Sequence, residues 1–169
     1  MDNWRVFSTT DLVTWTLADT LLPSAMHWDD QVHSCWATDA AHRAGQYYVY
    51  VSAGPTQIGV VAGSSPHGPF TDPIGKPLVP NGLVPTQARD PGVLQDDDGS
   101  YYIVFGTFDY YVARLGDDLV SLAEARRMRN KKNKKQETTK NKKKKRGRRG
   151  TGRKTLIRDR TMHETRRNG

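Results

Sequence analysis

The chain has 169 residues, enough for one ordinary domain with a buried core. Its net charge of +8 averages two unlike regions, because residues 1–125 hold five basic against fifteen acidic residues (net −10) and residues 126–169 hold 21 basic against three acidic (net +18). The single cysteine, Cys35, excludes an internal disulfide, and we expect no signal peptide and no membrane span because no long apolar run occurs.

The acidic region is expected to be all-β. Short runs rich in Tyr, Val and Ile alternate with turn residues, and no segment sustains the apolar spacing of a helix. Runs 46–52 and 100–105 are too apolar for a strand with one solvated face, so both are predicted to lie inside packed sheets. In chain order, the expected strands are residues 5–8, 14–17, 46–52, 57–62, 100–105 and 110–115.

These runs repeat at an offset of 54 residues. The corresponding pairs include Trp36 and Asp90, Gly45 and Gly99, Tyr48 and Tyr102, and Ile58 and Val112. A repeat of about 40 to 50 residues with several antiparallel strands is typical of β-propeller blades, whose first strands line a central axis. The pattern therefore predicts that Trp36 and Asp90 face a common cavity; the alternative is that both only pack or cap a turn.

The turn residues 96–99 (Asp-Asp-Asp-Gly) predict a hairpin turn rather than a cation site, because calcium needs six to eight oxygen ligands in a defined loop. His27, His33 and His42 lack the spacing of metal ligands, so we predict no metal site. The remaining candidate nucleophiles, Ser64, Ser65 and Cys35, have no recognisable base partner in the sequence.

Four groups of motifs follow one another within residues 4–122. They are RVFS (5–8) before DLVTW (11–15), Trp36-Ala37 before GQYY (45–48), GVVA (59–62) before SPHGPF (65–70), and Asp90-Pro91 before DDGSYY (97–102). In this order they resemble glycoside hydrolase family 43, the arabinosidases, arabinanases and β-xylosidases. The resemblance implies a partial five-bladed β-propeller in residues 1–125, with about two complete blades and part of a third, followed by a low-complexity, disordered basic tail in residues 126–169.

The resemblance also implies an inverting glycosidase, without a cofactor, for arabinose- or xylose-containing plant-type polysaccharides or oligosaccharides. Inversion needs one carboxylate to activate water and one carboxylic acid to protonate the leaving oxygen. In the family a third carboxylate, in the D-P motif, orients the general acid and raises its pKa, and the match gives this role to Asp90. Trp36 and Ala37, in the W-A motif, correspond to the wall of the sugar subsite.

The sequence departs from the family at the two other carboxylates. The family's general base precedes the strand that matches residues 5–8, its general acid follows the D-P blade, and Glu124 lies at the wrong place for that acid. Thr38 replaces the usual Pro after Trp36-Ala37. We therefore expect the chain to be an internal piece of a longer enzyme and to be inactive alone.

Other readings remain open for each region. The acidic region could be a noncatalytic carbohydrate-binding module that keeps Trp36, or a fructan-cleaving propeller, because Arg89-Asp90-Pro91 also resembles that related family's R-D-P motif. The basic tail could bind nucleic acid, but only nonspecifically and in a salt-dependent way because it has no aromatic residues. Alternatively it is a solvated run without function or, as we favour from the abrupt change in composition, the translation of an intron or a shifted frame.

Overall fold

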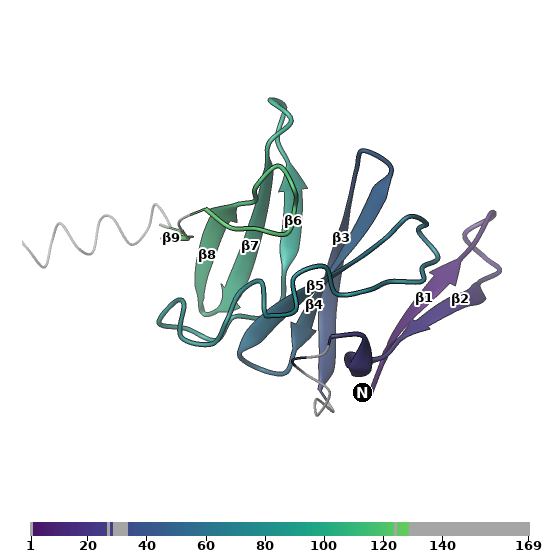
Figure 1. Cartoon of the computed structure of the whole chain (residues 1–169), viewed down its shortest axis with the longest axis horizontal. Coiled ribbons are helices and arrows are strands. Elements are labelled where there is room, and N and C mark those ends of the chain that lie inside the picture. The colour runs from purple at the N-terminus through teal and green to yellow at the C-terminus, as the bar shows by residue number, and fades with distance from the viewer. Residues whose placement is uncertain (1, 27, 29–33, 124, 129–169) are drawn as a thin grey trace, which may run out of the picture. The chain divides into compact units, whose positions relative to one another are not determined.

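The computed structural model describes residues 2–26, 28, 34–123 and 125–128 (Figure 1). This part of the chain is all-β, as predicted, with one 3-10 helix (η1, Pro23–Ala25) and no α-helix. None of its helices is long and apolar enough to cross a membrane. Residues 129–169, which make up nearly all of the predicted basic tail, lie outside the described residues, as do His27 and His33.

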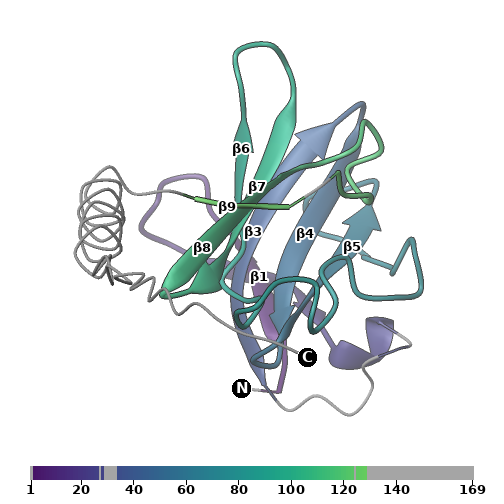
Figure 2. The same ribbon diagram turned by 90° about the vertical axis from the view of Figure 1, so that its left-hand side faces the viewer.

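The strands form three antiparallel sheets, which Figures 1 and 2 show from two directions. The first sheet is a hairpin of two strands, the second has three and the third has four. Isolated bridges from Ile58 to Val79 and from Ala62 to Thr71 extend the outer edge of the second sheet. The strands are β1 (Trp4–Ser8) and β2 (Thr16–Leu21); β3 (Cys35–Arg43), β4 (Gln46–Ala53) and β5 (Gln57–Gly63); and β6 (Gly92–Gln95), β7 (Tyr101–Thr107), β8 (Asp109–Arg114) and β9 (Arg126–Arg127).

Most of these strands lie where the sequence predicts them. Strands β1, β4, β5, β7 and β8 fall where they were expected, and β3 and β6 supply the first strands of the two repeat units. Strand β2 begins two residues after the expected start at residue 14 and continues to Leu21. The last strand, β9, pairs with β8 at residues 126–127, just after residue 125, where the propeller was expected to end.

The first strands of the two repeat units align at an offset of 53 rather than 54. Ala41 pairs with Tyr48, whereas Leu94 pairs with Tyr102, so the paired residues of β3 and β6 differ by 53. Asp90 precedes the first paired residue of β6, and its counterpart in the second sheet lies at the register shift between Cys35 and Thr38, which contains both Trp36 and Ala37. The physical reason is turn length, since two residues, 44–45, separate the first hairpin's closing pair and three, 97–99, separate its counterpart at residues 96 and 100.

The third strands align at an offset of 52. Tyr48 pairs with Ala62 and Tyr102 with Arg114, so Val112 corresponds to Val60 rather than to Ile58. The loop between β4 and β5 spans residues 54–56, whereas residue 108 alone separates β7 from β8. A sequence offset taken from the central strands therefore misplaces the flanking strands by one or two positions.

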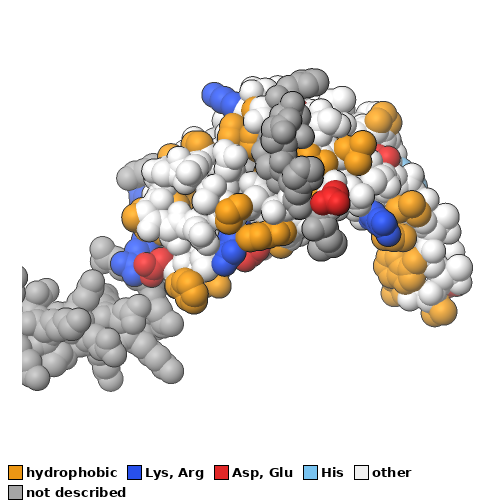
Figure 3. Space-filling model, turned by 90° about the horizontal axis from the view of Figure 1, so that it is seen from below, with side chains coloured by type: hydrophobic (Ala, Val, Ile, Leu, Met, Phe, Trp, Pro, Cys, Tyr) orange, Lys and Arg blue, Asp and Glu red, His pale blue; other side chains and the backbone are white. Residues whose placement is uncertain are grey.

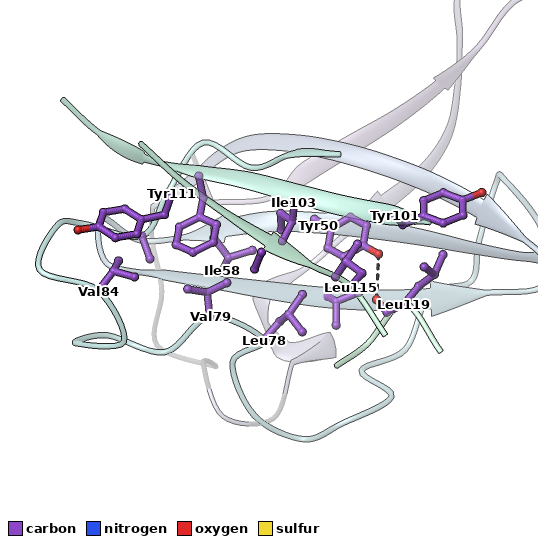
Figure 4. Packing of buried hydrophobic residues seen from close by; sticks show 14 residues of the cluster. Tyr50, Ile58, Leu78, Val79, Val84, Tyr101, Ile103, Tyr111, Leu115 and Leu119 are labelled. Atoms are coloured by element: carbon purple, nitrogen blue, oxygen red, sulfur yellow. Dashed lines mark hydrogen bonds between the residues drawn. The ribbon is translucent and has the colours of Figure 1, made fainter. Parts of the chain in front are cut away.

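Strand β4 is buried on both faces, which confirms the prediction from its apolar run. On one face Tyr50 packs in a cluster with Ile103 and Phe105 of β7 (Figure 4). On the other face Val51 packs in a second cluster with Trp4 of β1. The Tyr50 hydroxyl donates a hydrogen bond to the Leu119 carbonyl at 2.9 Å, and burial raises the pKa of Tyr50 above its usual range.

Candidate functional site

Asp90 lies two residues before β6, at the edge of the third sheet. Its φ is +53°, a left-handed conformation that costs a residue with a side chain about 1 to 2 kcal/mol. The Asp90 N–H donates to the Ser52 hydroxyl of β4 at 2.8 Å, and Ser52 is fully buried. The Asp90 side chain remains 55% exposed, so its carboxylate is available to a ligand.

Arg89 connects Asp90 to Trp36. The Arg89 guanidinium carbon lies 5.2 Å from the centroid of the Trp36 ring, within the range of a cation–π interaction. Its Nε donates to Thr107 Oγ1 at 2.7 Å and lies 3.9 Å from Asp90 Oδ2. Trp36 and Asp90, which were expected to face one cavity, are thus linked through the side chain of Arg89.

Trp36 and Ala37 form a β-bulge in β3. The register against β4 shifts between Cys35 and Thr38, which leaves two residues opposite one. The Trp36 carbonyl accepts a hydrogen bond from Trp4 Nε1 at 2.8 Å, and the Trp36 side chain is half-buried. Ala37 is exposed beside it. A bulge re-aims side chains, so this backbone feature fixes how the Trp36 ring is presented.

A second contact between the sheets involves Asp39 of β3. Its Oδ2 accepts the N–H of Val93 in β6 at 2.6 Å, and its Oδ1 accepts the N–H of Ala40 at 2.8 Å. The backbone on either side of Pro91 is therefore bound by side chains of the neighbouring sheet, at Asp90 and at Val93.

The acidic run before β7 forms a hairpin turn, as predicted. The Gly99 N–H donates to the Asp96 carbonyl at 2.9 Å, and Asp98 Oδ1 accepts the N–H of Ser100 at 2.8 Å. This backbone hydrogen bond from Ser100 lowers the pKa of Asp98. Among the described residues, no group of three or more His, Cys, Asp or Glu side chains could hold a metal ion.

Ser52, Asp39 and Thr107 were not identified from the sequence, and Arg89 entered only through the R-D-P motif. Ser52 carries the one usable signal, because it is a polar residue at the end of an apolar run predicted to be buried, and buried hydroxyls need a partner. Nothing in the sequence pairs Asp39 with Val93, since the contact spans 54 residues and two sheets.

Residues 1–151 match glycosyl hydrolases family 43, and the chain belongs to this family. Among its relatives, a β-D-galactofuranosidase of Aspergillus niger is 34% identical over 130 residues, which cover 69% of this chain and 38% of the relative. An arabinoxylan arabinofuranohydrolase of Paenibacillus polymyxa is 33% identical over 121 residues, which cover 63% of this chain and 19% of the relative. The family match extends beyond residue 125 into the basic region.

The fold is shared with a solved structure of an α-L-arabinofuranosidase from Clostridium thermocellum. The two chains superpose with a TM-score of 0.63 and 34% identity over 75% of this chain and 45% of that one. The chain thus spans less than half of the length of each of these three relatives.

Proposed function

We propose that this protein takes part in the inverting hydrolysis of arabinose- or xylose-containing polysaccharides, with Asp90 as the carboxylate that orients the general acid and raises its pKa. The observation that carries this proposal is the position of Asp90 at a sheet edge. Its backbone is held by Ser52, its carboxylate is open to solvent, and Arg89 joins it to the Trp36 ring. On this proposal the three sheets are blades of a five-bladed propeller.

Trp36 would supply the apolar wall of the sugar subsite, with Ala37 beside it. An aromatic ring offers a face to the C–H groups of a sugar. Because the Arg89 guanidinium lies over one face of the ring, a sugar would contact the opposite face or the exposed edge. The two relatives named for a furanoside, one an arabinofuranohydrolase and one a galactofuranosidase, support a five-membered sugar ring as the first ligand to test.

The roles of general base and general acid are assigned to no residue of the 169. We propose that the chain on its own binds the sugar through Trp36 and Asp90 without hydrolysing it. Hydrolysis then requires two further carboxylates. Sugar binding by the isolated chain can therefore be measured separately from hydrolysis.

Calorimetry with arabinotriose and xylotriose tests the binding role. We expect Trp36→Ala to weaken binding by about 10-fold, as loss of a stacking partner does, and Asp90→Asn to weaken it through loss of a charged acceptor. Asp97→Asn, in the hairpin turn, is the matched control and should leave binding unchanged. No heat with either sugar from the unaltered chain would refute the binding role.

Release of nitrophenol from aryl arabinofuranosides, xylosides and galactofuranosides tests the catalytic role. The isolated chain should release none. Turnover that Asp90→Asn abolishes would show that residues within the 169 supply the other two carboxylates, and the assignment of a single catalytic carboxylate would then be wrong.

A further inference from the structure

Two side chains of the second sheet hold the backbone segment that carries Asp90 into β6. Ser52 of β4 accepts the N–H of Asp90, and Asp39 of β3 accepts the N–H of Val93. Both acceptors are side-chain oxygen atoms, so these contacts depend on residue identity and not on strand pairing alone. We propose that Ser52 and Asp39 are positioning residues that clamp residues 90–93 at two points and thereby fix where the Asp90 carboxylate lies.

The first point of the clamp offsets an unfavourable backbone conformation. Asp90 has a positive φ, and the first residue of this segment that pairs with β7 is Gly92. The Ser52 hydroxyl, 2.8 Å away and fully buried, gives the Asp90 N–H its partner. An N–H group left without a partner in such a place is unfavourable, so removing the hydroxyl should allow the backbone at Asp90 to leave this conformation.

The second point of the clamp acts on the free edge of β6. Among the strands that the structure describes, β6 is at the end of its sheet, so the N–H groups that face away from β7 have no ladder partner there. Asp39 supplies a carboxylate oxygen to one of them at 2.6 Å, a short distance typical of charge-assisted hydrogen bonds. Its other oxygen is bound to the Ala40 N–H, which fixes the orientation of the carboxylate.

The two points act together because they lie three residues apart on either side of Pro91. The fixed φ of Pro91 removes one backbone freedom between them. With both ends held, the segment has little room to rotate, and the Asp90 carboxylate keeps its position beside Arg89 and Trp36. The clamp itself is independent of any function; its role in positioning rests on the proposed function of Asp90.

Amide hydrogen exchange on the whole chain, followed by NMR, tests the clamp. We expect Ser52→Ala to speed exchange at Asp90 by about 10-fold or more, and Asp39→Leu to do the same at Val93, with smaller changes at Val60 in the core. Asp39→Asn keeps an oxygen acceptor and should restore protection at Val93, and Ser64→Ala is the matched control for the serine change. Unchanged exchange at Asp90 and Val93 in the first two variants would overturn the clamp.

Calorimetry with arabinotriose on the same variants tests the positioning role. Ser52→Ala and Asp39→Leu should weaken binding to the extent that Asp90→Asn does, and Asp39→Asn should recover at least half of the lost binding free energy. Faster exchange with unaltered affinity would overturn the positioning role while leaving the clamp. No binding by the unaltered chain would refute the proposed function and the positioning role with it, and the exchange rates would still decide whether the clamp exists.

Discussion

At the scale of single residues, Arg89 has the most connections in the candidate site. It stacks on Trp36, donates to Thr107 and lies beside Asp90, and its own side chain is only 25% exposed. A planar guanidinium can do these things at once because its Nε–H points in one direction while its face lies over a ring. An ammonium group has no such geometry.

Arg89→Lys should therefore destabilise the protein despite keeping the charge. We expect a loss of about 1 to 2 kcal/mol in the free energy of unfolding, from the cation–π interaction and the hydrogen bond to Thr107 together. Urea denaturation measures this loss, and the Trp36 indole N–H resonance should shift in the same variant. Arg114→Lys is the control, because Arg114 makes an exposed hydrogen bond to Ser100 at 3.2 Å. Equal stability of both variants would contradict the bridging role.

At the scale of elements, the loop between β1 and β2 shows how one carboxylate sets a strand boundary. Asp11 Oδ1 accepts the N–H groups of Val13 and Thr14 at 2.9 and 2.7 Å and the Thr9 hydroxyl at 3.0 Å. These bonds hold residues 13 and 14 in the loop, so β2 begins at Thr16 and not at the predicted residue 14. Local side-chain capping of this kind competes with strand pairing.

The same hydrogen bonds predict how the loop responds to acid. They lower the pKa of Asp11 from 3.8 to about 2, with the Thr14 and Val13 amides as the largest causes. Because the folded pKa is depressed, the stabilisation is fully present above pH 4 and is lost as the pH falls towards 2. The amide shifts of Val13 and Thr14, followed by NMR, should titrate with a midpoint near pH 2. Asp11→Asn should abolish the titration, and a midpoint near 3.8 would contradict the loop geometry.

Sequence reasoning succeeded with the strands and failed where turns and contacts between sheets decide the outcome. Strands β4 and β7 were predicted because their apolar runs are long and buried. The offset between the paired residues of β3 and β6 was misplaced by one position, because a turn one residue longer cannot be seen in an offset taken from Tyr-Tyr runs. Trp36 and Asp90 stay predictions as site residues, whereas the hydrogen bonds of Ser52 and Asp39 reach backbone atoms of another sheet, which no motif records.

At the scale of the whole described region, the β1–β2 hairpin presents an apolar surface to solvent (Figure 3). Its exposed large side chains are Phe7, Leu12, Val13, Trp15 and Leu17. Within the described residues the hairpin is a sheet of two strands, so it also offers unpaired backbone groups at its edges. Exposed apolar surface next to an open strand edge favours association between chains.

The hairpin should therefore govern self-association of the 169-residue chain. We expect oligomers that grow with protein concentration. Val13→Lys combined with Leu17→Lys should shift the distribution towards monomer, because both changes replace exposed apolar surface with charge and Leu17 lies on an edge strand, where lysine blocks edge-to-edge pairing. Sedimentation velocity at several concentrations measures the distribution. Leu94→Lys, at another exposed leucine on the edge strand β6, is the control and should have less effect. If Leu94→Lys dissociates the oligomers and the two hairpin substitutions do not, the chains associate through the third sheet and not through the hairpin.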